Sequence, residues 1–270
     1  MRLEDTLTPF VSRIVITVAL VPLVLGAVWL GHWWMFALVA IAAAVALHEY
    51  WLMARPLSPL APAGYIGAAL ALVGAELSGV SWMLAGVLST FALAFMLKAI
   101  SEARAAATAA ISATVMGTLW IGGGLAFMIV LRDIPHHGRL ALVTLLVAVW
   151  AGDTFAYFGG RVFGRHKMAP STSPGKTWEG FVFGTAATIF VAFVALYKQN
   201  FLTIRESIVL GVVLALAGPT GDLFESLLKR DAGVKDSGNL LGGHGGMLDR
   251  LDAFLFAAPA AYFTILAFTG

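Results

Sequence analysis

The sequence contains no cysteine. This absence excludes a disulfide framework, a thiolate metal site and a cysteine nucleophile, and it says nothing about the compartment. Charged residues are also scarce, because Asp, Glu, Lys and Arg make up 12% of the chain, whereas soluble domains have about 25%. The chain has no dense basic run, and its formal net charge is only +2. We therefore expect no nucleic-acid partner.

Long apolar runs take the place of the missing charge. Hydrophobic residues account for 60% of the chain, which predicts an all-α, polytopic integral membrane protein. A spanning helix needs roughly 20 mostly apolar residues, and about nine candidate spans meet that requirement. They lie near residues 13–31, 33–53, 60–77, 80–98, 108–131, 139–160, 178–197, 206–228 and 251–269. No clear small-residue cleavage site follows the first run, so we expect it to be retained.

The lysines and arginines divide unevenly between the two sides of this predicted bundle. One side carries 13 and the other 4, which together make the 17 of the chain. The larger group is Arg2, Arg13, Arg55, Lys98, Arg104, Arg161, Arg165, Lys167, Lys176, Lys229, Arg230, Lys235 and Arg250, and the smaller is Arg132, Arg139, Lys198 and Arg205. Because cytoplasmic loops carry the excess of positive charge, the division predicts a cytoplasmic N-terminus and an outside C-terminus.

The same division predicts that the polar connections 161–177 and 229–250 lie together on the cytoplasmic side. Residues 1–138 hold about five of the spans and little polar chemistry, whereas nearly all residues that suggest chemistry follow Trp150. We therefore divide the chain into N-terminal membrane helices, 1–138, and a C-terminal catalytic membrane region, 139–270.

The eighth predicted span contains the sequence AGPTGDLFESLLKR. Pro219 removes a backbone donor, and the glycines beside it permit a bend, so we expect the helix to be interrupted there. Asp222 follows the expected break, and Glu225 shares its helix face. Intramembrane acids are rare and usually functional, which favours a cation site over a lysine-paired acid at the membrane surface.

Asp249 and Asp252 open the ninth span, with Arg250 between them. Acids at a helix N-terminus are favoured by the helix dipole, which is the simpler explanation for both. The alternative is that Asp222 and Asp249 converge on one hard cation, since Mg²⁺ is held by one or two carboxylates together with phosphates and water. The preceding GGHGG run allows backbone N–H groups to approach a phosphate, and His244 within it is a candidate donor.

The connection HKMAPSTSPGKTWEG supplies hydroxyl groups and the compact charge of Lys176. It lacks the spacing and the strand context of a P-loop. An ordinary polar loop, with Thr177 capping the next helix and Glu179 in its first turn, is the alternative interpretation. Asp153 lies within the otherwise apolar sixth span and is either a third candidate residue for the same polar centre or a structural hydrogen-bonding group.

Other polar residues in or near the spans are weaker candidates. His48 and Glu49 lie near the cytoplasmic end of the second span, where pairing at the interface explains them, and Glu76 lies in the third. We assign no role to His136 and His137, which fall in a predicted outside loop.

The segment from Ser226 to Asp252, SLLKRDAGVKDSGNLLGGHGGMLDRLD, resembles the C-terminal signature of the phosphatidate cytidylyltransferases, also called CDP-diacylglycerol synthases. Residue types and spacing agree throughout. The segments WAGDTFAYFGG and SPGKTWEG resemble two further marks of that family and occur in the expected order. The first half of the chain resembles the family only in being a bundle of membrane helices.

The resemblance implies that CTP and phosphatidate react to give CDP-diacylglycerol and pyrophosphate. It implies Mg²⁺, as one or two divalent ions, with a monovalent cation left open. It also implies a dimeric multi-pass enzyme of the bacterial inner membrane, and the division of positive charge predicts that its active site faces the cytoplasm. The family's metal-binding aspartates fall on Asp222 and Asp249, and its Ser-Pro-x-Lys loop falls on Ser173, Pro174 and Lys176. Gly175 and Gly242 depart from the family pattern, which often has lysine and proline there.

We assign three roles on this basis. The groups expected to offset phosphate charge or act directly in catalysis are Lys176, Lys229, Arg230, His244 and Arg250. The expected substrate-binding residues are Ser173, Thr177, Lys235, Gly245 and Gly246. The expected metal ligands are Asp222, Asp249, Asp252 and Asp153. Asp236 is expected to be an additional ligand or to support the others.

Two other functions fit parts of the pattern. A secondary transporter also has broken helices and intramembrane acids, although here the charges gather in loops. A CTP-dependent lipid kinase acting on a polyprenol or phytol would need a general base for its neutral hydroxyl acceptor. The long match over Ser226–Asp252 favours the cytidylyltransferase.

Overall fold

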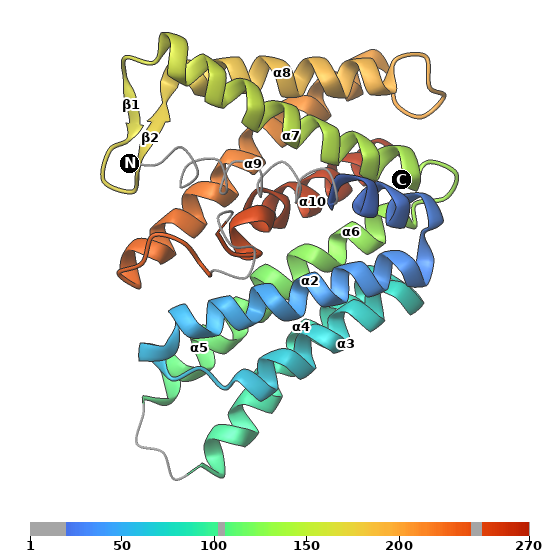
Figure 1. Ribbon diagram of the computed structural model, residues 1–270. Coiled ribbons are helices and arrows are strands. Elements are labelled where there is room, and N and C mark those ends of the chain that lie inside the picture. Colours follow the sequence, from blue (N-terminus) through green and yellow to red (C-terminus); the bar gives the residue numbers. More distant parts are fainter. Residues whose placement is uncertain (1–19, 102–105, 239–244, 270) are drawn as a thin grey trace. The chain divides into compact units, whose positions relative to one another are not determined.

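The structure is a computed structural model that describes residues 20–101, 106–238 and 245–269 (Figure 1). Eight of its helices are long and apolar enough to cross a membrane, counted over these residues. They are α2 (His32–Met53), α3 (Ala61–Ser78), α4 (Val80–Ala99), a continuous run over Ala107–Arg132, α7 (Gly138–Phe163), α8 (Trp178–Leu196), α9 (Ile204–Asp231) and α10 (Leu248–Thr269). The predicted all-α membrane architecture is confirmed. The first expected span, 13–31, lies partly outside the described residues, and its described part includes the apolar helix Leu20–Leu30.

By their internal contacts the residues form two compact units. The first comprises the described residues up to Ile129 and the segment Ala232–Leu251, and the second comprises Val130–Asp231 and the residues from Asp252 onward. The first unit thus includes most of the glycine-rich segment before α10 as well as the N-terminal helices. Helix α10 contributes its first turn to one unit and the rest of its length to the other.

The run over Ala107–Arg132 is not one regular α-helix. It consists of α5 (Ala107–Gly117), a π-helical segment η2 (Thr118–Gly123) and α6 (Gly124–Arg132). A Cβ added at Gly117 would meet the Tyr50 ring, and one at Gly122 would lie 2.8 Å from the Ala68 Cβ. The glycines of this run therefore let it pack closely against α2 and α3. A short 3₁₀ helix, η1 (Arg55–Leu57), follows α2.

The second unit is built on a tight pair of helices, α7 and α8, which lie side by side in Figure 1. A Cβ added at Gly180 would lie 2.6 Å from the Ala156 carbonyl oxygen, and one at Gly184 would lie 2.8 Å from the Gly152 carbonyl oxygen. Small residues at four-residue intervals allow helix backbones to approach this closely in membranes. The spacing of glycines in the two sequences therefore sets the separation of the helices.

A two-stranded hairpin joins these helices where the sequence predicted only a polar loop. Strand β1 (Lys167–Ala169) pairs antiparallel with β2 (Ser173–Thr177), with Lys167 opposite Thr177 and Ala169 opposite Ser173. The strands are too short and too polar for an alternating apolar pattern to reveal them. Helix α8 begins directly after β2, so the hairpin fixes where the residues of β2 lie relative to that helix.

The predicted interruption at Pro219 is wrong. Helix α9 continues from Ile204 to Asp231 with Pro219 inside it. A proline removes one backbone hydrogen bond, and in a membrane helix neighbouring groups commonly compensate for it. The other turns of this 28-residue helix keep their backbone hydrogen bonds, and the helix packs against α8. Asp222 therefore projects from a continuous helix rather than from a break.

Candidate active site

A cavity of about 460 Å³ lies in the second unit between α7, α8 and α9, beside β2. Small residues line much of it, including Gly152, Gly160, Gly180 and Gly218. Its polar lining brings together five side chains that were predicted as site residues: Asp153, Ser173, Lys176, Thr177 and Asp222. Three separate sequence segments thus supply one site.

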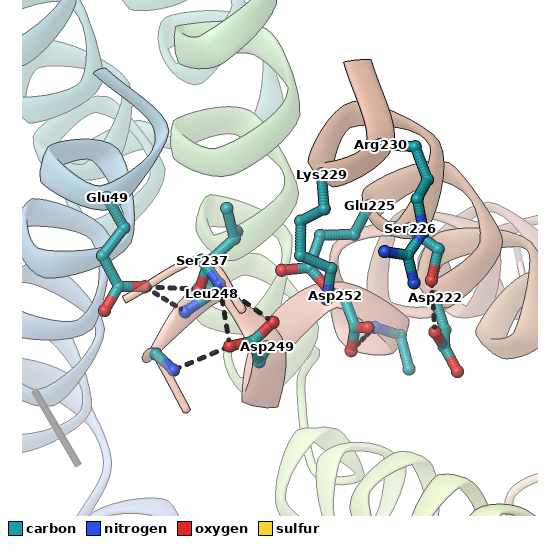
Figure 2. Close-up of polar contacts among 12 residues, drawn as sticks. Glu49, Asp222, Glu225, Ser226, Lys229, Arg230, Ser237, Leu248, Asp249 and Asp252 are labelled. Atoms are coloured by element: carbon teal, nitrogen blue, oxygen red, sulfur yellow. Dashed lines mark hydrogen bonds and ion pairs between the residues drawn. The ribbon is translucent and has the colours of Figure 1, made fainter. Parts of the chain in front are cut away.

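An ion pair occupies the polar side of this cavity. The Lys176 ammonium nitrogen lies 2.8 Å from Asp222 Oδ2 and 3.4 Å from the Pro219 carbonyl oxygen, to which it donates. Ser226 donates to Asp222 Oδ1 over 3.4 Å, a long contact drawn in Figure 2. The Asp222 side chain is 41% exposed, so the pair is open to an incoming ligand.

Asp153 is a second acid of the same cavity. It projects from α7 and is close enough to Asp222 and Lys176 to interact electrostatically with both. Arg161, two turns further along α7, also lines the cavity and donates to the Tyr157 hydroxyl over 2.7 Å. The sequence analysis counted Arg161 only as a loop charge, although its spacing from Asp153 places both on nearly one face of α7.

The end of β2 is fixed by the start of α8. Thr177 is the N-cap, and its hydroxyl oxygen accepts from the Gly180 N–H over 3.1 Å. The Glu179 carboxylate accepts from the Arg165 and His166 backbone N–H groups over 3.1 and 3.2 Å. The predicted cap is confirmed, and it is compatible with a place in the cavity wall. These contacts hold both ends of the hairpin beside the cavity.

A further group of charges lies where α9 passes α10. Glu225 is fully buried, and Lys229 donates to its Oε2 over 2.8 Å. Asp252 is also buried and interacts electrostatically with both Glu225 and Asp222. A Cβ added at Gly221 would collide with the Asp252 carbonyl oxygen, so the two helices are in close contact here. Sequence analysis noted Glu225 on the Asp222 face but missed its pairing with Lys229, which the i,i+4 spacing signals.

Two contacts test the predicted grouping of loops within the second unit. Arg230 Nε donates to the Thr172 carbonyl oxygen over 3.2 Å, which joins the end of α9 to the hairpin. The rings of His137 and Phe201 stack with centroids 4.5 Å apart, which joins the connections before α7 and before α9. In each of these two contacts, both segments are ones that the charge division assigned to a common side. Which side faces the cytoplasm stays a prediction.

The first unit contains the other predicted metal ligand, Asp249. Its Oδ2 accepts from the Gly246 N–H over 2.7 Å and from the Ser237 N–H over 3.1 Å (Figure 2). Gly245 has φ +77°, a conformation that glycine adopts without strain. Asp249 therefore binds backbone donors on both sides of the glycine-rich segment, as the explanation from helix-start chemistry anticipated.

Glu49 of α2 is the residue that sequence analysis most undervalued. It is only 4% exposed, and its carboxylate accepts from the Met247 and Leu248 N–H groups over 2.9 and 2.8 Å. The Ser237 hydroxyl donates to its Oε2 over 3.0 Å. Glu49 is thus anchored to a segment nearly 200 residues away. The available signal in the sequence was an acid within a predicted span.

The remaining predicted residues are less informative. Lys235 and Arg250 are exposed, and Asp236 lines a second cavity of about 430 Å³ with Arg55 and Ser237. The predictions for His244 and for the Gly242 turn lie outside the described residues. Asp222 belongs to the second unit and Asp249 to the first, so their convergence on one cation stays a prediction.

The carboxylate groups of the site are suitable ligands for a hard divalent cation. Asp153 and Asp222 present carboxylate oxygens to one cavity, and Mg²⁺ takes oxygen ligands and keeps several waters. Among the described residues, no group of three or more acidic or histidine side chains forms a complete metal site.

Comparison with known proteins places this membrane helix bundle in a family. The family model described as the cytidylyltransferase family matches residues 11–268. The chain belongs to the cytidylyltransferase family.

Individual relatives carry a more specific description. Over 130 residues the chain is 42% identical to the phosphatidate cytidylyltransferase of Haemophilus influenzae, covering 46% of this chain and 45% of the relative. Over 155 residues it is 37% identical to that of Bacillus subtilis, covering 57% and 58%. Over 146 residues it is 42% identical to that of Staphylococcus aureus strain COL, covering 53% and 55%. The chain spans about half the length of the curated relatives it matches.

Proposed function

We propose that this protein is a phosphatidate cytidylyltransferase. An oxygen of the phosphatidate phosphate attacks the α-phosphorus of CTP, the bond from that phosphorus to the bridging oxygen breaks, and pyrophosphate leaves. The lipid product is CDP-diacylglycerol. The observation that carries the proposal is the cavity of about 460 Å³ that gathers Asp153, Lys176 and Asp222 between membrane helices, in a chain of the cytidylyltransferase family.

The reaction needs electrostatic help more than acid–base chemistry. The lipid phosphate is already anionic near neutral pH, so its attacking oxygen needs little general base. The difficulty lies in bringing two polyanions together and in stabilising charge on the leaving pyrophosphate. Lys176 and Arg161 supply positive charge at the cavity, and the Ser173 hydroxyl supplies a hydrogen-bond donor.

Positioning is the second contribution of the protein. Because the two acyl chains stay in the bilayer, the phosphate approaches a cavity formed between membrane helices while CTP comes from water. Holding both substrates in line turns a bimolecular encounter into an oriented step. The fixed ends of the hairpin at Thr177 and Glu179 favour such preorganisation of Lys176.

We further propose that Asp222 and Asp153, with Asp249, hold one or two Mg²⁺ ions. When bound, such an ion neutralises phosphate charge and polarises the phosphoryl oxygens. The Asp222 and Asp153 carboxylates would hold this cation in the cavity. Lys176 would then be available to pair with a phosphate group of the nucleotide. The active site is proposed to face the cytoplasm of a bacterial inner membrane.

The experiment that tests the proposal follows the α-phosphate of CTP. Detergent-purified protein is incubated with phosphatidate, Mg²⁺ and CTP labelled at that position, and the lipid and nucleotide products are separated. Label moving into lipid together with release of pyrophosphate is the expected result, and excess EDTA should abolish it. Label kept in CDP, with a lipid alcohol as acceptor, would replace the proposal with a lipid kinase. No metal-dependent turnover with any lipid would overturn it.

A further inference from the structure

We infer that Glu49 is a positioning residue that holds the Asp249 carboxylate in its working geometry. The inference rests on the proposed function, because it takes Asp249 as a ligand of the divalent ion. Glu49 lies on α2, far in sequence from the segment that precedes α10. Its carboxylate nevertheless contacts Ser237 in that segment and Leu248 at the start of α10.

The contacts form a short chain through Ser237. The Ser237 hydroxyl donates to Glu49 Oε2 over 3.0 Å, while the Ser237 N–H donates to Asp249 Oδ2 over 3.1 Å. One residue therefore binds both carboxylates, one through its side chain and the other through its backbone, as Figure 2 shows. A shift of Glu49 moves Ser237, and a shift of Ser237 changes the support of Asp249.

Glu49 also fixes the other side of Asp249. It accepts from the N–H groups of Met247 and Leu248, which immediately precede Asp249 at the start of α10. The Gly246 N–H in turn donates to Asp249 Oδ2 over 2.7 Å. The backbone N–H groups of residues 246–248 are therefore all bound by the carboxylates of Glu49 and Asp249.

The glycines of the segment allow this arrangement. A Cβ added at Gly238 would lie 2.5 Å from Glu49 Oε1, and one at Gly246 would collide with Glu49 Oε2. Backbone and carboxylate thus approach closely on both sides of Glu49. The acid is buried and bound by three donors, which is the pattern of a group that orients a ligand from behind.

Substitution of Glu49 by Gln tests the inference. Gln has one carbonyl oxygen where Glu has two acceptor oxygens, so it cannot serve the three donors together. Loss of groups that orient metal ligands typically costs about 10- to 100-fold in metal affinity or activity. We expect Glu49→Gln to raise the Mg²⁺ concentration for half-maximal rate about tenfold or more, with much of the rate recovered at saturating Mg²⁺.

A second readout does not depend on turnover. Mn²⁺ binding to the purified, nucleotide-free protein is measured from the loss of the free-Mn²⁺ electron paramagnetic resonance signal. Glu49→Gln should weaken this binding by a similar factor, and Ser237→Ala, which keeps the backbone donor to Asp249, should weaken it less. If Glu49→Gln does not accumulate as folded protein, Ser237→Ala carries the test alone.

Glu206→Gln is the matched control. Glu206 also supports a helix start, accepting from the Thr203 N–H over 2.7 Å, but it is only half-buried and lies outside the cavity lining. It should leave the Mg²⁺ dependence and Mn²⁺ binding unchanged. A merely structural Glu49 would lower the yield or thermal stability of the variant while the folded fraction kept the Mg²⁺ dependence of the unaltered protein, and that result would overturn the inference.

The two proposals fail differently. If the unaltered protein transfers no cytidylyl group, the proposed function fails whatever the variants do. If the unaltered protein is active but Glu49→Gln and Ser237→Ala match it in Mg²⁺ dependence and in Mn²⁺ binding, only the inference about Glu49 fails. If the active protein binds no measurable Mn²⁺ without nucleotide, the Mg²⁺ dependence of Glu49→Gln decides the inference, and an unchanged dependence overturns it.

Discussion

At the residue scale, the chemistry of this protein depends on acids that are held by cations and by backbone donors. Asp222 is paired with Lys176, and Asp249 is bound by the N–H groups of Gly246 and Ser237. Sequence reasoning selected these residues because carboxylates in or beside membrane spans are costly. It could not pair Asp222 with Lys176, since Asp222 lies within the eighth predicted span and Lys176 in the connection 161–177.

Asp222→Asn should abolish cytidylyl transfer while the protein stays folded. The change removes the charge that balances Lys176 and a proposed divalent ion, and electrostatic contributions of this kind are worth roughly 100-fold or more in rate. The labelled-CTP assay measures the loss, and gel filtration with thermal unfolding reports the fold. Asp249→Asn should behave likewise, and near-normal activity of both variants would refute the metal assignment.

At the element scale, two local features determine the shape of the cavity. Thr177 ends the hairpin and caps α8, so the position of Lys176 in β2 is tied to the start of a helix. Glycines on α7 and α8 bring these helices together beside the cavity. The cap was predicted from the sequence, whereas the hairpin was not, because strands of three and five residues are too short to show an alternating apolar pattern.

Thr177→Ala should destabilise the start of α8 by about 1 kcal/mol, the usual effect of losing an N-cap. Because the cap also anchors β2, we expect a clear rise in the KM for CTP together with only a small fall in the thermal unfolding temperature. Thr177→Ser keeps a hydroxyl acceptor and should restore both quantities. Equal behaviour of the Ala and Ser variants would show that the cap does not position Lys176.

Gly184→Ala should destabilise the second unit. The added methyl group would lie 2.8 Å from the Gly152 carbonyl oxygen, so the two helices must separate. Overpacking of this kind costs typically about 1–3 kcal/mol, and thermal denaturation in detergent measures it. Gly26→Ala serves as the control, because nothing lies within 4 Å of the added atom. An unchanged Gly184→Ala variant would mean that the helices tolerate a wider separation.

At the scale of the whole molecule, the distribution of positive charge predicts how the chain lies in a membrane. Within the second unit the loops group as that distribution requires, since Thr172 meets Arg230 and His137 meets Phe201. The hairpin and the end of α9 therefore belong to one side of this unit, with the connections before α7 and before α9 on the other. The assignment of those sides to cytoplasm and exterior rests on the positive-inside tendency.

The cysteine-free sequence offers a direct test of that orientation. Ser171→Cys in the hairpin turn and Gln199→Cys in the connection before α9 introduce exposed thiols at opposite sides of the second unit. A membrane-impermeant maleimide should label Gln199→Cys in cells with a permeable outer envelope, and it should label Ser171→Cys only in inverted vesicles. The cysteine-free parent supplies the background, and the reverse pattern would place the site on the outer face.

The sequence by itself determined the features that depend on composition and on neighbouring residues. The lengths of the apolar runs predicted the membrane helices, and Thr177 indicated the cap of α8. The residues from Ser226 to Asp252 carried the family resemblance. These signals are local, because hydropathy and capping act over a few turns of one helix.

Only the tertiary structure decided which distant residues meet. It joined Lys176 to Asp222, carried α9 unbroken through Pro219, and placed the buried Glu49 of α2 against Ser237 and the start of α10. No spacing in the sequence encodes such contacts, because they arise when a buried carboxylate finds the donors that make its desolvation tolerable. The partners of Glu49 were therefore decided by packing across nearly 200 residues of chain.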